Sequence, residues 1–257
     1  MKHPAAIIHP DATLAADVAV GPFAVIEGAA RIGAGCVIQA HAVIGAHVVM
    51  GERNTIGHGA IIGGDPQDFS FKATVASEVR IGSDNRIREY ATIHRGTAEG
   101  SATVVGDHCF LMAGAHLGHN TRLGDRVIIA NNALLGGHVL VEDGVFIGGG
   151  CVFHQHVRVG RLAICQGASA FGKDIPPFTM AAERNGVAGL NTVGLRRAGL
   201  DAAQRAEIKA AFTLLYRSGK NVAQALAAAR ERPWGAEGRA FWDFVAASGK
   251  RGLCGPA

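Results

Sequence analysis

The fold of this chain is decided around the stretch Leu111-Met-Ala-Gly-Ala-His-Leu-Gly-His-Asn120. From Val105 to Phe171 an apolar residue recurs at every sixth position: Val105, Leu111, Leu117, Leu123, Ile129, Leu135, Val141, Ile147, Phe153, Val159, Cys165 and Phe171. This spacing is neither that of a helix nor that of an ordinary strand. Hexapeptide repeats are typical of the parallel β-helix, in which short strands wind into a prism. We therefore predict a β fold, a left-handed parallel β-helix.

A second column of small or β-branched residues follows four places after the first: Cys109, Ala115, Thr121, Val127, Ala133, Val139, Val145, Cys151, Val157, Ala163 and Ser169. We expect both columns to point inward, with large residues filling each coil and small residues fitting its corners. A coil of three hexapeptides would take about 18 residues and rise by roughly 4.8 Å. Residues roughly 16 to 20 apart should therefore lie near each other on one outer face.

The same period runs through the N-terminal part of the chain, from Ile8 to Ile62, and resumes at Ile81. Between them, residues 64–78 have no hexapeptide pattern, so we predict a loop that leaves the prism. Loops on one face of a repeat fold often carry function, which makes this one a candidate for reaching a ligand or a neighbouring subunit. A shorter loop is expected from Thr97 to Thr103.

The prism is expected to end at Pro176 and Pro177, because proline cannot donate a hydrogen bond to a strand ladder. The composition then becomes helical. We divide the chain into a β-helix domain, residues 1–189, and a C-terminal α-helical domain, residues 190–257.

Three helices are predicted in the second domain. Asp201 and Gln204 form a capping box before an apolar stripe with helical spacing. Asn221 would cap a second helix that ends before Pro233, and residues 241–245 suggest a third.

Composition places the chain among soluble globular proteins, since 48% of its 257 residues are hydrophobic and 18% are charged. The net charge of +4 is too small to indicate a nucleic-acid partner. Neither a signal peptide nor a membrane-length apolar run is present, so we expect no membrane span. The five cysteines are odd in number and include no CxxC pair, which indicates reduced thiols in a cytoplasmic protein.

Four histidines outside the inward columns are candidates for chemistry: His116, His119, His138 and His154. The spacing from His119 to His138 and on to His154 predicts that these three stack on one face. A neutral histidine can act as a general base near physiological pH. The plain alternative is that they are exposed side chains without a role.

Zinc is a competing use for such histidines. Some hexapeptide β-helices resemble carbonic anhydrases, which bind zinc with three histidines across a trimer interface, two of them five positions apart. No two histidines of this chain have that spacing. We therefore predict no metal and no other cofactor.

Motifs along the whole chain resemble those of the acyl-[acyl-carrier-protein]–UDP-N-acetylglucosamine O-acyltransferase family. The shared segments are Pro66-Gln-Asp68, Ile87-Arg-Glu, Thr92-Ile-His94-Arg-Gly-Thr97, Ala115-His116-Leu-Gly-His119, Ala130-Asn-Asn-Ala133, Gly137-His138, His154-Gln155, Asp174-Ile-Pro-Pro177 and Tyr216-Arg-Ser-Gly-Lys220. The resemblance implies a homotrimer with active sites between neighbouring prisms. It also implies transfer of a 3-hydroxyacyl group from acyl carrier protein to the 3-OH of UDP-N-acetylglucosamine, the first step of lipid A biosynthesis.

By this resemblance His119 is the catalytic base, and the backbone N–H of Gly137 stabilises the oxyanion. The resemblance further implies a set of substrate-binding residues: Gln67, Asp68, His94, His116, His138, His154, Gln155, Gly167, Asn191 and Arg197. Among them Gly167 matches the position that limits acyl length, and Arg197 matches a residue that reaches the UDP group.

Three residues depart from the family pattern: Asn120 replaces an Asp, Ser70 replaces a Lys and Val193 replaces a Glu. The departures leave two alternatives open. One is the same reaction on a 3-amino analogue of the sugar, which would give an amide. The other is a hexapeptide protein that binds acyl carrier protein or a sugar nucleotide without catalysis.

Overall fold

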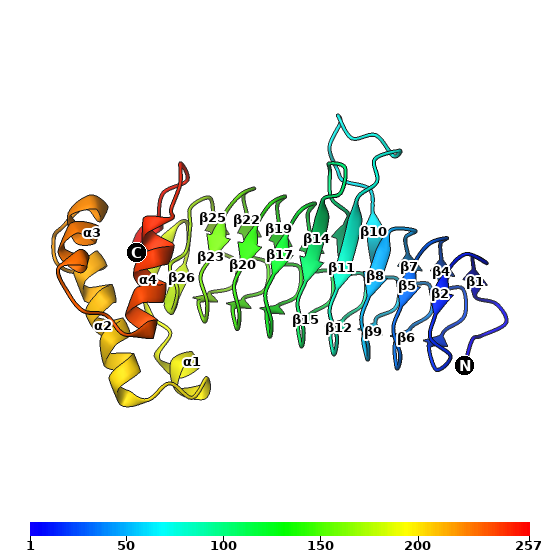
Figure 1. Cartoon of the computed structure of the whole chain (residues 1–257), viewed down its shortest axis with the longest axis horizontal. Coiled ribbons are helices and arrows are strands. Elements are labelled where there is room, and N and C mark those ends of the chain that lie inside the picture. The colour runs from blue at the N-terminus through cyan, green and yellow to red at the C-terminus, as the bar shows by residue number, and fades with distance from the viewer.

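The computed structural model describes residues 1–257 as a three-sided prism of short strands with a group of helices at its C-terminal end (Figure 1). Neighbouring strands of the prism run parallel. Each side of the prism is one sheet, here called face 1, face 2 and face 3 in the order in which the chain meets them.

Face 1 has nine strands. They are β1 (Ile7–Ile8), β4 (Val25–Ile26), β7 (Val43–Ile44), β10 (Ile61–Gly64), β13 (Thr92–His94), β16 (His116–Leu117), β19 (Leu134–Leu135), β22 (Val152–Phe153) and β25 (Ala170–Phe171). Face 2 has eight strands. They are β2 (Thr13–Leu14), β5 (Arg31–Ile32), β8 (Val48–Met50), β11 (Glu78–Ile81), β14 (Ala102–Val105), β17 (Arg122–Leu123), β20 (Leu140–Val141) and β23 (Arg158–Val159).

Face 3 has eleven strands. They are β3 (Ala19–Val20), β6 (Val37–Ile38), β9 (Thr55–Ile56), β12 (Arg86–Ile87), β15 (Phe110–Leu111), β18 (Ile128–Ile129), β21 (Phe146–Ile147), β24 (Ile164–Cys165), β26 (Thr179–Ala182), β27 (Gly186–Leu190) and β28 (Gly255–Pro256). The predicted left-handed parallel β-helix is confirmed.

The interior of the prism is built from the two predicted columns. Leu111, Leu117 and Ile129 from the large column are completely buried, as are Ala115 and Val127 from the small column. They belong to one continuous hydrophobic cluster that runs along the prism. Each coil therefore buries its apolar residues against the coils before and after it, which is why the repeat must be long to be stable.

All five cysteines are buried and unpaired. Burial raises the pKa of Cys109 to about 11 and that of Cys254 to about 12. Since the thiolate is the reactive form, these cysteines fill the core and take no part in chemistry.

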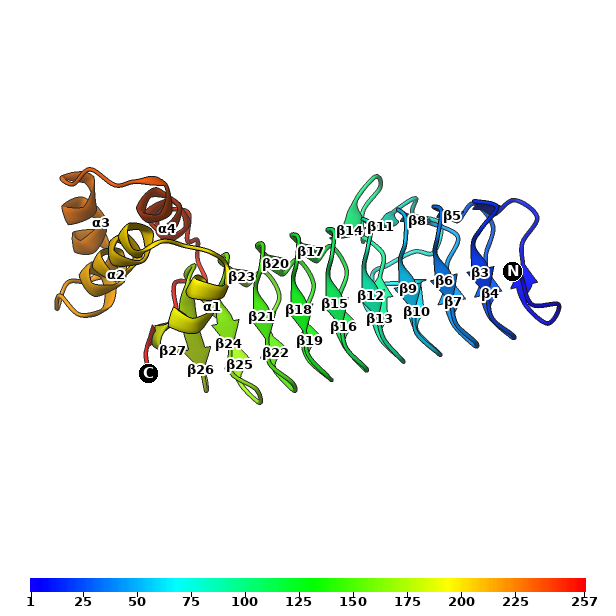
Figure 2. The same ribbon diagram turned by 90° about the horizontal axis from the view of Figure 1, so that it is seen from below.

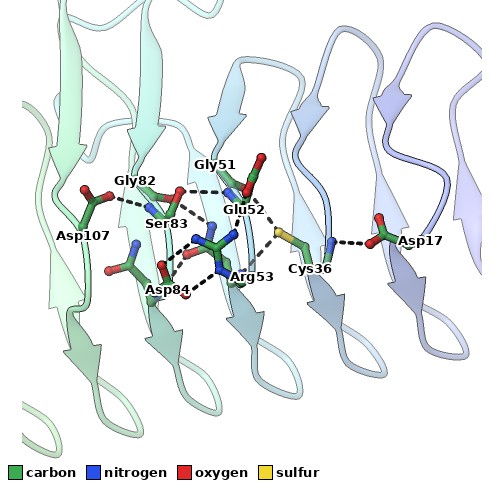
Figure 3. A network of polar contacts seen from close by, with 12 residues as sticks. Asp17, Cys36, Gly51, Glu52, Arg53, Gly82, Ser83, Asp84 and Asp107 are labelled. Carbon is green, nitrogen blue, oxygen red and sulfur yellow. Dashed lines mark hydrogen bonds and ion pairs between the residues drawn. The ribbon is translucent and has the colours of Figure 1, made fainter.

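A polar network joins successive coils at the corner between face 2 and face 3 (Figure 3). Asp107 Oδ1 accepts a hydrogen bond from the Ser83 N–H at 2.6 Å, and Ser83 Oγ accepts one from the Glu52 N–H at 3.0 Å. The Arg53 guanidinium donates to both carboxylate oxygens of Asp84, at 2.8 and 2.9 Å. The contacts of Ser83 and Glu52 satisfy backbone donors that the turning chain leaves outside the ladders, and the Arg53–Asp84 pair links two coils through side chains, so we interpret this corner as structural.

The predicted long loop occupies residues 65–77, between β10 and β11, and stands away from the prism (Figure 1). It leaves the corner between face 1 and face 2. The shorter loop covers residues 95–101 and ends earlier than predicted, because Thr103 already pairs with Val79 in the ladder of β14 and β11.

The prediction that the prolines end the ladder is wrong. Strand β26 follows Pro177 and pairs in parallel with β24, and β27 then turns back to pair with β26 in the antiparallel sense. Both prolines lie before β26, where the chain turns a corner and needs no ladder donor.

Four helices follow: α1 (Thr192–Arg197), α2 (Ala202–Tyr216), α3 (Val222–Arg230) and α4 (Ala236–Ala246). The predicted capping box of Asp201 with Gln204 is confirmed, and Asn221 caps α3 as expected. The sequence analysis missed α1. Helices α2, α3 and α4 gather beyond the last coils, and α1 lies beside these coils (Figure 2). None of the four helices has both the length and the apolar composition needed to cross a membrane. The division into two domains at residue 190 stays a prediction.

Candidate active site

The candidate site lies at the corner between face 1 and face 2, where three successive coils turn. The turn after β16 carries His119 and Asn120, and the turn after β19 carries Gly137 and His138. The His138 N–H donates to the His119 carbonyl at 2.9 Å, and the His156 N–H donates to the Gly137 carbonyl at 3.0 Å. These bonds align the turns, so that equivalent residues lie one above the other.

His119 occupies space that only a glycine in the next coil can leave free. A Cβ added to Gly137 would lie 2.4 Å from both Cε1 and Nε2 of the imidazole. The Gly137 N–H donates to no acceptor in the protein. The corner thus brings an imidazole and an unused backbone donor side by side.

Asn120 determines which nitrogen of His119 carries the proton. The Thr97 N–H donates to Asn120 Oδ1 at 3.1 Å, and the Thr97 hydroxyl donates to the same oxygen at 3.0 Å. A backbone N–H can only donate, so the amide atom at this position is the oxygen. His119 Nδ1 lies 3.0 Å from that oxygen and must donate to it. Nε2 of the neutral ring is therefore the free, basic nitrogen.

His138 and His156 continue the column beside His119. The rings of His119 and His138 meet edge to face at 5.1 Å, and His156 stacks on His138 at 4.5 Å. Burial lowers the pKa of His138, with a smaller contribution from the two neighbouring histidines. We conclude that His138 is neutral near pH 7.

His154, the predicted third member of the stack, is not part of it. Its Nδ1 lies 3.3 Å from the Gln155 carbonyl, and His156 takes the place against His138. His156 follows His138 by the coil length of about 18 residues, so a stricter use of the coil period would have found it. His154 and Gln155 themselves lie at the same corner, in the turn after β22.

Two further histidines lie on face 1 next to this corner. His94 and His116 meet edge to face at 4.8 Å, and His116 Nδ1 forms a hydrogen bond with the Thr92 hydroxyl at 2.7 Å. Burial lowers the pKa of both, and for His94 the nearby charges of His116 and His119 help to bring it to about 4. Both rings are therefore neutral hydrogen-bonding groups near pH 7.

The long loop contributes Asp68 and Gln67, whose side chains are exposed. Ser70 donates to Asp68 Oδ1 from its N–H at 2.8 Å and from its hydroxyl at 2.7 Å. These two hydrogen bonds lower the pKa of Asp68, and the field of His119 adds to the effect. Ser70, one of the departures from the family pattern, therefore holds the Asp68 carboxylate in place.

Three predicted site residues lie elsewhere in the chain. Gly167 is in the turn between β24 and β25, at the corner between face 3 and face 1. Asn191 is the N-cap of α1, where it accepts from the Gly194 N–H at 3.0 Å, and its amide donates to the Leu162 carbonyl at 2.8 Å. Arg197 is exposed at the end of α1. Within a single copy of the chain, these three residues lie away from the corner that carries His119.

No group of three or more His, Cys, Asp or Glu side chains is arranged to hold a metal ion. The close histidine rings of the corner contact each other through edges and faces instead.

Acidification should destabilise the protein through His94. Its pKa is lower in the folded protein than in the unfolded chain, so between about pH 6.5 and 4 the unfolded chain binds a proton that the folded chain does not. The free energy of unfolding should fall over this window by about 3 kcal/mol at most. Urea unfolding at pH 7 and pH 4.5 measures this fall.

His94→Gln should remove most of that pH dependence and leave a smaller slope from His116 and His138. His47→Gln, at an exposed position, is the control and should keep the wild-type slope. An unchanged slope in His94→Gln would show that His94 is not the group responsible.

Family models match two parts of the chain. Residues 174–254 match the second domain of UDP N-acetylglucosamine O-acyltransferase, and residues 102–137 match the bacterial transferase hexapeptide, six repeats. The two matches lie on the helical end and on the part of the prism that carries His119.

Similar proteins include an acyl-[acyl-carrier-protein]–UDP-N-acetylglucosamine O-acyltransferase of Sulfurihydrogenibium, 51% identical over 98% of this chain and 93% of its own length. The protein of the same name from Gloeothece citriformis is 44% identical over 65% of this chain and 61% of its own length. A solved structure of a UDP-N-acetylglucosamine acyltransferase from Bacteroides fragilis is 37% identical, superposes with a TM-score of 0.94 and covers 98% of this chain and 99% of that one.

Proposed function

This chain belongs to the acyl-[acyl-carrier-protein]–UDP-N-acetylglucosamine O-acyltransferase family, and from that premise we propose how its residues carry out the reaction. It transfers an acyl group from acyl carrier protein to the 3-OH of UDP-N-acetylglucosamine, which is the first step of lipid A biosynthesis. The observation that carries this proposal is that the free His119 Nε2 and the unused Gly137 N–H lie side by side at one corner.

His119 is the general base. Its Nε2 takes the proton of the sugar 3-OH as the oxygen attacks the thioester carbon. Negative charge then develops on the thioester oxygen, and the Gly137 N–H donates to it. When the C–S bond breaks, the imidazolium returns the proton to the carrier thiolate. An ester and a free carrier thiol result, and His119 is neutral again.

The sugar binds beside the base. Asp68 and Gln67 reach it from the long loop, and the neutral His116 and His94 donate or accept hydrogen bonds from face 1. An exposed carboxylate held by Ser70 suits sugar hydroxyls, which can donate to it. His138 contacts both sugar and donor.

The remaining substrate residues act between subunits. His154 and Gln155 hold the nucleotide and the acyl chain, whereas Gly167, Asn191 and Arg197 come to the site from a neighbouring prism. A homotrimer provides this arrangement. Exposed apolar side chains on face 1 support it, since Ile61, Leu134 and Val152 are each between 42% and 44% exposed in the single chain.

The protein works in the cytoplasm without a cofactor. Its five unpaired, buried thiols fit a reducing compartment, and each group in the proposed reaction is supplied by the chain or by the two substrates.

The test is acyl transfer by the purified protein from a panel of 3-hydroxyacyl carrier proteins to UDP-N-acetylglucosamine or its 3-amino analogue, followed by mass spectrometry. We expect an ester on the first sugar. If an amide formed only on the analogue, the substrate would be the 3-amino sugar and His119 would still be the base. Binding without turnover on either sugar would contradict the proposal.

Asn120→Asp should shift the acidic limb of the pH–rate profile to higher pH by about one unit, because a carboxylate against Nδ1 favours the protonated ring. The rate at its pH optimum should stay within about tenfold of the wild type, since the carboxylate keeps the ring orientation. Profiles of kcat/KM from pH 5 to 9 measure this shift.

Asn120→Ala is the control that tests the orientation of the His119 ring without adding a charge. It removes the acceptor for Nδ1–H, so it should lower the rate without the shift towards higher pH. An Asn120→Asp profile that coincides with that of the wild type would contradict the role given to Asn120.

A further inference from the structure

Arg95 is a buried arginine beneath the long loop, next to His94 in sequence. Its side chain is only 4% exposed, whereas the Asp65 carboxylate with which it pairs at 2.9 Å is 56% exposed. A buried guanidinium must have its N–H groups satisfied to be tolerated. The loop supplies these acceptors.

The contacts of Arg95 connect the two ends of the loop. Nε donates to Asp65 where the loop begins. Nη2 donates to the Ala73 carbonyl at 2.9 Å, and Nη1 donates to the Val75 carbonyl and, at 3.2 Å, to Ser77 Oγ, where the loop ends. Gln67 and Asp68 lie on the segment between these anchor points.

The middle of the loop also rests on Arg95. The guanidinium carbon lies 4.8 Å from the centre of the Phe71 ring, within the range of a cation–π contact. A planar guanidinium can donate in several directions while it stacks on an aromatic ring. A lysine ammonium is a single point of charge and cannot make this set of contacts.

The segment that carries Arg95 also reaches the catalytic corner. Two residues further on, Thr97 holds the Asn120 amide that orients His119. One short stretch of chain therefore supports both the loop with Asp68 and the ring of His119.

We infer that Arg95 is a positioning residue that holds residues 65–77 over the site and thereby sets the affinity for the sugar nucleotide. The inference rests on the proposed function of Asp68. Arg95 touches neither substrate in this arrangement and acts through the loop.

The prism should keep its fold when Arg95 is replaced, because the end of the loop has other anchors. The Ala76 N–H donates to the Glu99 carboxylate at 3.1 Å, and the Ala76 carbonyl accepts from the Gly100 N–H at 2.8 Å. The Arg95 side chain makes no hydrogen bond to β10 or β11, and the bond from the Arg95 N–H to the Gly64 carbonyl of β10 is a backbone bond that a substitution leaves in place.

The experiment compares Arg95→Ala, Arg95→Lys and Asp68→Asn with the double variant Arg95→Ala/Asp68→Asn in steady-state kinetics. Each single variant should raise the KM for UDP-N-acetylglucosamine by about tenfold or more and change kcat by less than about threefold. Arg95→Lys should therefore show the same raised KM as Arg95→Ala. The KM of the double variant should be no higher than that of the worse single variant, because both substitutions act through the contact of Asp68 with the sugar.

A second measurement does not depend on activity. Lys72 is the only Lys or Arg between residues 65 and 77, so trypsin cleavage after it reports how firmly the loop is held. Arg95→Ala should be cut there at least about tenfold faster than the wild type under native conditions, since local opening controls proteolysis. Asp65→Ala, which alters an exposed partner and should not threaten folding, should be cut at an intermediate rate.

Arg80→Ala is the matched control. Arg80 is a neighbouring arginine on β11, 59% exposed and paired only with Glu78, so its loss should change neither KM nor cleavage. Wild-type cleavage in Arg95→Ala, or additive losses in the double variant, would overturn the inference. If the wild type transferred no acyl group but Arg95→Ala was still cut faster, the proposed function would fail. The conclusion that Arg95 holds residues 65–77 in place would remain.

Discussion

His119→Ala is expected to fold and assemble like the wild type but to lose acyl transfer almost completely. The side chain makes one polar contact, to the Asn120 amide, and lies outside the buried columns of the prism. Its removal should therefore have little effect on the free energy of unfolding. A general base contributes about 10² to 10⁴ in rate, so kcat/KM should fall by at least about 10².

The measurement is kcat/KM from initial velocities at saturating 3-hydroxyacyl-loaded acyl carrier protein and varied UDP-N-acetylglucosamine, together with thermal unfolding and size-exclusion chromatography of the same samples. His47→Ala is the control, because His47 is an exposed histidine at the same corner in an earlier coil. A His119→Ala protein with a rate near that of the wild type would rule out the mechanism.

Gly137→Ala should be nearly as damaging, although it adds only one methyl group. That methyl would lie 2.4 Å from His119 Nε2, so the imidazole must rotate away from the position in which Asn120 holds it. The variant should misalign the His119 base, and its methyl group should also crowd the Gly137 N–H that donates to the oxyanion. Together these two effects should lower kcat/KM by at least about 10².

The stability of Gly137→Ala should change little, because the three atoms nearest to the added Cβ all belong to the His119 ring and Gly137 does not have a positive φ. Gly172→Ala is the matched control in a later turn of the same corner, where an added Cβ meets nothing closer than 3.8 Å. We expect wild-type kcat/KM from Gly172→Ala. Wild-type activity in Gly137→Ala would show that His119 does not work in the position seen here.

The coil period predicted one part of the candidate site, the neighbouring histidines of the corner, whereas the other candidate residues came from the family resemblance. The period placed His119 beside His138 because residues about one coil apart must stack when every coil has the same length. It failed at His154, because a difference of two residues moves a side chain to another position of the turn. His156, one full coil from His138, takes the stacked position instead.

The roles of Asn120 and Ser70 could not be predicted from the sequence. As departures from the family pattern they left open a 3-amino sugar or binding without catalysis. In the structure the Asn120 amide still accepts from Nδ1 of His119, and Ser70 holds the Asp68 carboxylate. Their effect depends on Thr97 and on the fold of the loop, which no spacing rule describes.

By itself, the sequence determined the prism, its core and the corner at which the histidines gather. The reason is physical: the same short pattern is repeated in coil after coil, so local spacing alone decides which side chains are buried. Only the tertiary structure decided how Arg95 holds the loop and that β26 continues face 3 beyond Pro177. Those features arise where the repeat is interrupted, and there the contacts between distant segments, rather than the period, fix the position of each side chain.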